Sequence, residues 1–85
     1  MYRLFISQAA DKQTARLPAK ARQKISDAIG QLRDNPRPRG CKKLKGEDEL
    51  WRIRVGDYRV VYTIEDDELI VLVVRVANRK DVYDR

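Results

Sequence analysis

The chain has no histidine and only one cysteine, Cys41, among its 85 residues. A lone cysteine excludes an internal disulfide and a cysteine-based metal site, which fits a reducing cytoplasm. The N-terminus does not resemble a signal peptide, because Arg3 interrupts a very short apolar run. The longest apolar run, residues 69 to 74, is far too short to span a membrane. These absences predict a cytoplasmic protein in which Cys41 is an ordinary loop thiol or partly buried thiol.

Charge, in contrast, is abundant. The sequence is 42% hydrophobic and 38% charged, with a net charge of +6 and a pI near 9.8. The composition is that of a globular chain rather than a disordered one, and the length predicts a single domain over residues 1–85 that buries about 60% of its unfolded surface. Such a pI is typical of nucleic-acid-binding domains, although a basic protein without a polyanionic partner has the same composition.

The N-terminal half predicts a strand followed by two helices. Residues 1–7 alternate like a strand, and Ser7 can cap a short helix that runs to about Leu17. Pro18 suits the first turn of a second helix, which should end at residues 34–36, Asp-Asn-Pro. The apolar residues of this second helix recur at helical spacing and predict one buried stripe: Ala21, Ile25, Ala28, Ile29 and Leu32.

Residues 36–49 predict a loop, because they are rich in proline, glycine and charge. Acids are absent from its first part and then follow together at residues 47–49. The basic residues of the first part are Arg37, Arg39, Lys42, Lys43 and Lys45. This distribution fits either a solvated loop or a basic rim that follows a phosphate backbone.

Three strands are predicted after the loop, at about residues 50–56, 58–65 and 68–77. Strand, two helices and then a run of antiparallel strands predict an α+β fold, with about four strands and both helices on one face of the sheet. The tail after the last strand adds Arg79, Lys80 and Tyr83. The Tyr83 phenol can stack on a base or act on a sugar hydroxyl, or it can anchor the C-terminus against the sheet.

The stretch LWRIRVGDYRVVY, residues 50–62, carries the most specific signal. Gly56-Asp57 predicts a two-residue type II′ hairpin, because glycine occupies its first central position. This register places Arg54 opposite Arg59 and assigns these two arginines and Arg52 to the sheet face away from the helices. Like charges directly opposite one another are destabilising. Either the two arginines lean apart into solvent, or an anion such as a phosphodiester normally lies between them.

With these pieces in place, the chain resembles the RelE/ParE superfamily of bacterial toxins, and RelE-type toxins in particular. The resemblance covers nearly the whole chain, from LRDNP through GCKKLKG and LWRIRVGDYRVVY to VANRKDVY. It implies a toxin that cuts messenger RNA in the ribosomal A site and is neutralised by a cognate, RelB-like antitoxin. It also implies attack of a ribose 2′-hydroxyl on the adjacent phosphate, without a metal or other cofactor.

The resemblance further implies which residues are catalytic. The family's basic strand positions correspond to Arg52 and Arg54, its G-x-Y-R arginine to Arg59, its tail arginine to Arg79 and its late tyrosine to Tyr83. The basic residues of the loop and the tail are themselves the predicted contacts to RNA and the ribosome: Arg37, Arg39, Lys42, Lys43, Lys45 and Lys80.

Two departures from the family pattern concern the general base. Many relatives have histidine where this chain has Asn78, and some have lysines where it has Arg52 and Arg54. Arginine stays protonated and is a poor proton acceptor. Tyr83 is one candidate base; alternatively, catalysis relies on orientation and charge neutralisation while the ribosome or solvent takes the proton. Two other functions remain open: a ParE-like toxin that binds DNA gyrase, and a non-catalytic basic binding module.

Overall fold

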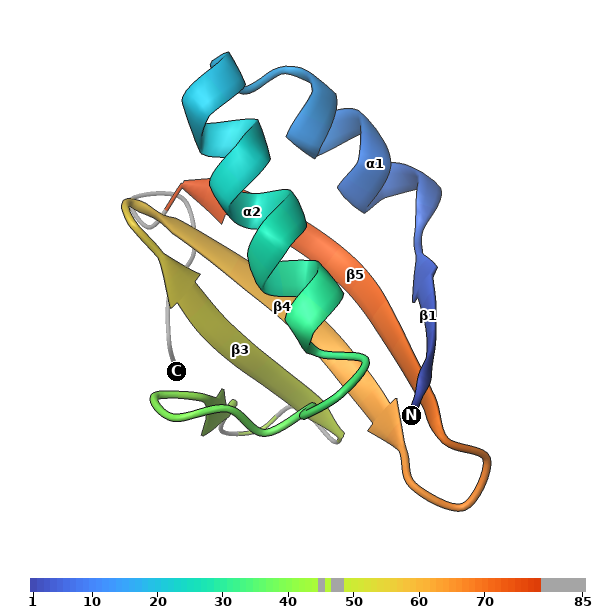
Figure 1. Cartoon of the computed structure of the whole chain (residues 1–85). Helices are drawn as coiled ribbons and strands as arrows, with labels where there is room; N and C mark the ends of the chain where they lie inside the picture. Colours follow the sequence, from blue (N-terminus) through green and yellow to red (C-terminus); the bar gives the residue numbers. More distant parts are fainter. Residues whose placement is uncertain (45, 47–48, 79–85) are drawn as a thin grey trace.

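The computed structural model describes residues 1–44, 46 and 49–78 of the chain. The two helices follow the first strand and precede all the others (Figure 1). In chain order the elements are β1 (Arg3–Ile6), α1 (Gln8–Ala15), α2 (Ala19–Gln31), β2 (Lys42–Lys43), β3 (Leu50–Val55), β4 (Tyr58–Glu65) and β5 (Ile70–Asn78). The predicted α+β class is confirmed, and the three long strands begin and end within two residues of their predicted limits.

The sheet has five strands in the order β1-β5-β4-β3-β2. Neighbours are antiparallel except β1, which pairs in parallel with β5. The expectation of a wholly antiparallel sheet is therefore wrong at this edge. The chain leaves β1 through both helices before it forms the rest of the sheet, and a long crossover of this kind is what parallel pairing requires.

The second difference from prediction is β2, which lies inside the segment predicted to be a loop. It is only two residues long, with Lys42 opposite Arg52 and Lys43 opposite Trp51. A further backbone bond from Leu44 N–H to the Leu50 carbonyl closes the pairing at 2.9 Å. The lysines have no alternating apolar pattern, so the strand forms because β3 offers an unpaired edge.

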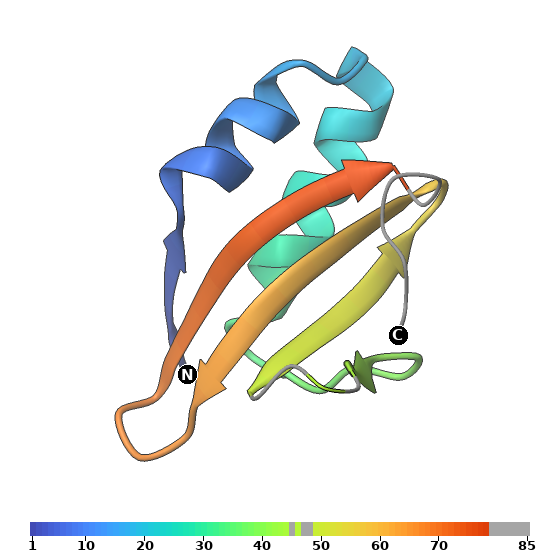
Figure 2. The same ribbon diagram turned by 180° about the vertical axis from the view of Figure 1, so that it is seen from behind.

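Both helices cover the same face of the sheet, and no helix of the described residues lies on the other face (Figures 1 and 2). Ser7 caps α1, since its Oγ accepts a bond from Ala10 N–H at 3.1 Å. The same hydroxyl donates to the Val74 carbonyl at 3.0 Å and so ties the helix to β5. Pro18 is the N-cap of α2 rather than a residue of its first turn. No helix in the described part of the chain is long and apolar enough to cross a membrane.

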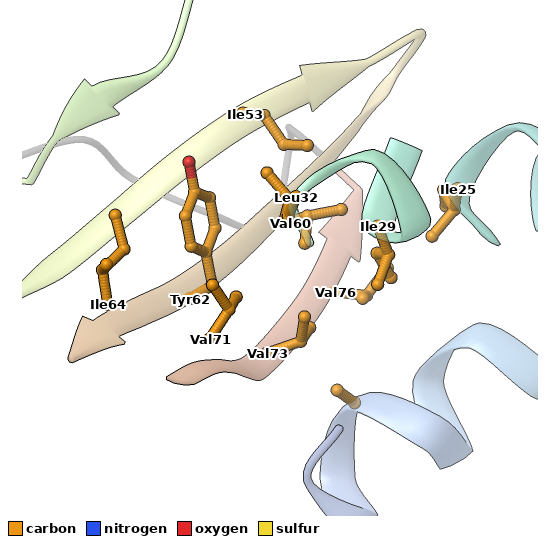
Figure 3. Close-up of a cluster of buried hydrophobic side chains, with 11 residues drawn as sticks. Ile25, Ile29, Leu32, Ile53, Val60, Tyr62, Ile64, Val71, Val73 and Val76 are labelled. Carbon is orange, nitrogen blue, oxygen red and sulfur yellow. The ribbon is translucent and has the colours of Figure 1, made fainter. Parts of the chain in front are cut away.

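The hydrophobic core lies between α2 and the sheet, as Figure 3 shows. The predicted stripe of α2 supplies Ile25, Ile29 and Leu32, which are buried, whereas Ala21 and Ala28 are partly buried. The alternating residues of β3, β4 and β5 supply the other side: Ile53, Val60, Tyr62, Ile64, Val71, Val73 and Val76. Because strand residues alternate between faces, this packing fixes which side chains lie on the opposite, helix-free face.

Candidate functional site

The hairpin between β3 and β4 has the predicted register. Gly56 has a φ of 60°, as the first central position of a type II′ turn requires, and Val55 pairs with Tyr58 across it. Arg54 is consequently the direct cross-strand partner of Arg59. Both alternate with core residues, so they lie on the helix-free face, where Arg52 lies as well. The predicted placement of these three arginines is confirmed; their catalytic role remains a prediction.

The sheet register extends this cluster into two rows. One row runs across four strands as Lys42, Arg52, Val61 and Arg75, and the next contains Arg54, Arg59 and Ala77. Directly paired residues share a face. The five cationic residues of these rows, which we call the basic face, are Lys42, Arg52, Arg54, Arg59 and Arg75.

The face on which Arg75 lies is determined by how β4 pairs with β5. The register of β4 against β5 shifts between Val61 and Tyr62, and β5 carries the extra residue. Before this irregularity the odd-numbered residues of β5, such as Val73, face the helices. After it the even-numbered residue Val76 faces them. Arg75 therefore joins the basic face, where it is exposed. The sequence did not indicate this irregularity, because residues 70–74 are all apolar and show no alternation.

The arginines of the basic face differ in accessibility. Arg54 is exposed, whereas Arg52 and Arg59 are only 3% and 8% exposed. The Nε atoms of these two buried side chains are inaccessible to solvent. A side chain that is already held in place loses less conformational freedom when it binds a ligand than a mobile one does. Arg52 and Arg59 are largely shielded from solvent, whereas Arg54 presents its charge at the surface.

The predicted RNA-contacting residues are only partly in view. Arg39, Lys42 and Lys43 are exposed in the loop and in β2, and Lys42 also belongs to the basic face. Four residues predicted to be functional lie outside the described residues: Lys45, Arg79, Lys80 and Tyr83.

Arg37, also predicted to contact RNA, takes part in a cluster that sequence reasoning missed. Its guanidinium donates to both carboxylate oxygens of Asp66, at 3.1 and 2.9 Å, and lies 5.0 Å from the centroid of the Trp51 ring. Tyr2 donates to the same carboxylate at 2.8 Å. The cluster joins the N-terminus, the loop after α2 and the β4–β5 turn, which are too far apart in sequence for any local pattern to indicate it. Arg37 stays a predicted RNA contact, although its charge is already matched by Asp66.

Arg37 and Tyr2 hold the pKa of the Asp66 carboxyl below its ordinary value of 3.8, mainly through the hydrogen bond from Arg37. A carboxyl group whose pKa is lowered in the folded state stabilises the protein at pH values above its ordinary pKa. This contribution disappears as the pH falls through the lowered pKa. We therefore expect Asp66→Asn to reduce the free energy of unfolding at pH 7, with the difference from the parent shrinking below about pH 3.8.

Urea unfolding of both proteins at pH 7 and at pH 3 measures this difference. Asp67→Asn, at the neighbouring exposed carboxylate of the same turn, is the control. Equal stability of the parent and Asp66→Asn at pH 7 would show that the cluster contributes nothing.

Within residues 1–44, 46 and 49–78, no group of three or more acidic, cysteine or histidine side chains lies close enough to hold a metal ion. The chemistry of this face is instead that of fixed cations. Arginine presents planar sets of donors that match phosphate oxygens, and several arginines in two adjacent rows suit a polyanion better than a single small anion. The fold and this face together define a small basic domain suited to binding a nucleic-acid backbone.

Comparisons with known proteins identify the family of the chain. The family model described as the ParE toxin of the type II toxin-antitoxin system parDE matches residues 4–83. The chain therefore belongs to this family of type II toxins, within the RelE/ParE superfamily that its sequence resembles.

The individual relatives carry the RelE name. The chain is 37% identical to the toxin RelE of Mycobacterium tuberculosis, over 96% of this chain and 86% of the relative. It is 27% identical to the mRNA interferase toxin RelE of Escherichia coli K12, over 96% and 90%. Among solved structures, the archaeal RelE–RelB complex from Pyrococcus horikoshii aligns with a TM-score of 0.82 at 27% identity, covering 95% of this chain and 98% of that one.

Proposed function

We propose that this chain is the RelE-like toxin of a toxin-antitoxin pair and that it cleaves messenger RNA in the ribosomal A site. The cross-strand pair of Arg54 and Arg59 carries the proposal. Stability alone disfavours two like charges at directly opposed positions, by a few tenths of a kcal/mol up to about 1 kcal/mol. A phosphate between them converts that repulsion into binding energy. The name of the Escherichia coli relative, an mRNA interferase, supports RNA as the source of the phosphate.

In the proposed reaction the ribose 2′-oxygen attacks the adjacent phosphorus and the 5′-oxygen of the next nucleotide leaves. The products are a 2′,3′-cyclic phosphate and a 5′-hydroxyl. The 2′-proton passes to a base and the leaving oxygen gains a proton, so no oxidant, metal or cofactor is required. Negative charge grows on the phosphorane oxygens, and fixed cations that face these oxygens lower the barrier. Arg59 and Arg54 supply such charge, and Arg52 and Arg75 extend it along the strand of RNA.

The reaction also needs a group that accepts the 2′-proton. An arginine does not deprotonate in a protein, so none of the four arginines of the basic face can be this base. Tyr83 is the proposed proton acceptor, and the positive charge of Arg79 is proposed to lower its pKa. In the alternative, the ribosome or solvent takes the proton. Dependence on the ribosome follows from the same gap, because a site without a strong base gains most from a substrate that is already held in line for attack.

The exposed cations of the loop and of β2 are proposed to dock on the ribosome. They are Arg39, Lys42 and Lys43, of which Lys42 also belongs to the basic face. Lys45 and Lys80, which also belong to the predicted set, lie outside the described residues. The neutralising partner is proposed to be a RelB-like antitoxin, as in the Pyrococcus horikoshii complex.

The first expected result is that cleavage requires ribosomes. Purified protein is added to a translating extract, and the 5′-ends of the mRNA are mapped by sequencing. We expect cuts in phase with codons, and a loss of ribosome binding as salt rises, because phosphate contacts weaken with salt. The same RNA without ribosomes is the control. Equally rapid degradation of RNA without ribosomes would contradict the proposed dependence of cleavage on the ribosome.

The second candidate function is a ParE-like toxin that acts on DNA gyrase without cutting RNA, and the name of the matching family model favours it. Expression of the chain in cells, followed by analysis of mRNA and DNA, separates the two candidate functions. Intact mRNA together with DNA breaks in cells that express the chain supports the gyrase reading. Intact mRNA without DNA breaks supports a non-catalytic binding module.

A further inference from the structure

A hollow of about 330 Å³ opens beside the basic face, on the side of β3 that β2 leaves uncovered. Its lining comes from three segments that are distant in sequence: α2, the loop after it, and β3. The lining residues are Ala28, Gln31, Pro38, Arg39, Gly40, Ile53 and Arg54. The volume is at the lower end of the range for small-ligand sites, which is about 300–1,000 Å³.

Arg54 lines this hollow, and the hydrogen-bond pattern of β3 turns its backbone toward the uncovered edge of the strand. In a two-residue hairpin the flanking pair, here Val55 and Tyr58, exchanges hydrogen bonds, and bonded pairs then recur at every second residue. Arg54 therefore directs its N–H and C=O away from β4. The bond from Leu44 N–H to the Leu50 carbonyl agrees with this phase, because residues 50, 52 and 54 share an orientation. β2 pairs only as far as Arg52, so the Arg54 donor and acceptor lie beyond the end of that strand.

The surroundings of this backbone pair combine an apolar surface with a cationic border. Ile53 and Ala28 provide apolar surface, and Gly40, whose φ is 90°, leaves room because it has no side chain. Arg39 supplies positive charge, and the exposed Gln31 supplies an amide. The Arg54 side chain adds positive charge from the adjoining basic face. A flat aromatic ring with hydrogen-bonding groups on its edge, attached to a phosphate, matches each of these features.

We propose that this hollow, together with the Arg54 backbone, is a nucleobase subsite that sets the sequence preference of cleavage; the assignment rests on the proposed function. Single-stranded RNA is recognised through splayed bases that are hydrogen-bonded along their edges. Arg54 connects the two sites, because its backbone faces the hollow while its side chain pairs with Arg59 on the basic face. A base held here thus belongs to a nucleotide next to the scissile phosphate.

A peptide strand that adds to β3 fits this edge less well. Strands usually have about five or six residues, whereas the uncovered part of β3 spans only residues 53–55. The loop at Pro38–Gly40 borders the same hollow and limits how far an added strand extends. The two arginines favour an anion over an uncharged peptide backbone.

The test uses a substitution that fills the hollow from the solvent-exposed side of α2. Gln31→Trp places a large ring in the hollow, and Gln23→Trp makes the same change at an exposed position of the same helix, as the matched control. The first measurement follows backbone amide resonances by NMR while each of the four nucleoside 5′-monophosphates is added. We expect saturable shifts at Arg54 and Gly40 in the parent and in Gln23→Trp, unequal among the four nucleotides, and absent in Gln31→Trp. Shifts at neither amide with any nucleotide would overturn the subsite.

The second measurement maps the bases that flank the cuts in a translating extract. We expect Gln31→Trp to reduce the preference at one flanking position by on the order of tenfold, in line with the loss of a paired base contact. An unchanged distribution, whatever the overall rate, overturns the role in specificity. The two measurements separate the proposals: nucleotide binding at Arg54 without any mRNA cleavage by the parent supports the subsite and contradicts the proposed function.

Discussion

Replacing Arg59 by alanine is expected to slow mRNA cleavage by about 10²–10³-fold, equivalent to roughly 2.7–4 kcal/mol of transition-state stabilisation. The estimate is that for removal of one fixed donor from a group that stabilises a developing oxyanion. Arg59 suits this role because its side chain is nearly buried and lies opposite Arg54. Single-turnover cleavage of ribosome-bound message measures the effect, because it reports the chemical step without product release.

The matched control is Arg3→Ala. Arg3 is exposed in β1 and pairs with Ile70, which places it on the same helix-free face but far along the sheet from the two cationic rows. Arg3→Ala removes the same charge from the same face as Arg59→Ala, so a general electrostatic effect would slow mRNA cleavage equally in both variants. Circular dichroism and thermal unfolding establish that each variant folds. Full cleavage activity in folded Arg59→Ala would exclude an arginine-based site at this position.

The largest stability effect is expected from Tyr62→Phe. The Tyr62 side chain is fully buried, and its hydroxyl donates to the Pro36 carbonyl at 2.7 Å. Removing the hydroxyl leaves a buried carbonyl without its donor, at a cost of about 1–3 kcal/mol. A domain of this length is typically stable by only about 4–13 kcal/mol, so the loss is a substantial fraction of the total. Urea unfolding should show a lower midpoint at an unchanged slope.

The pH dependence of this effect follows from the raised pKa of the Tyr62 phenol. Burial is the main cause, and the adjacent Cys41 adds to it. A phenol whose pKa is raised in the folded state stabilises the protein at pH values below its ordinary pKa of 10.0. This stabilisation is lost as the pH rises toward the pKa of the folded state. The gap between parent and Tyr62→Phe should therefore be constant near neutrality and narrow above about pH 10. Tyr58→Phe, on the same strand and only partly buried, is the control, with an expected change within about 0.5 kcal/mol.

Local patterns were sufficient to predict several elements of the fold. Gly56-Asp57 specified a turn whose length fixed the register of β3 and β4, and the register determined the faces of the arginines. Ser7 specified the start of α1 through a bond to Ala10, three residues away. In each case the interacting groups are near neighbours in sequence, so the residue types alone constrain the geometry.

Features that depend on distant segments were not predictable. The parallel pairing of β1 with β5 joins Arg3 to Ile70, and nothing in either strand specifies its partner. The face of Arg75 depends on a register shift in the middle of a regular strand pair. The hollow beside β3 forms only where β2 stops, and β2 is itself too short to have a pattern. The interaction of Arg37 with Asp66 was missed for the same reason, so a basic loop residue was assigned to RNA alone.

The position of β5 in the sheet has a consequence for folding during synthesis. β5 is the last strand of the described residues, yet it lies between β1 and β4 and pairs with both. While β5 is still inside the translating ribosome, β1 has no strand partner and β4 has one bare edge. The sheet is therefore complete only after β5 has been made, since contacts between distant segments form only once both exist. Because β5 also supplies Arg75, the basic face of the toxin is complete only after the same step.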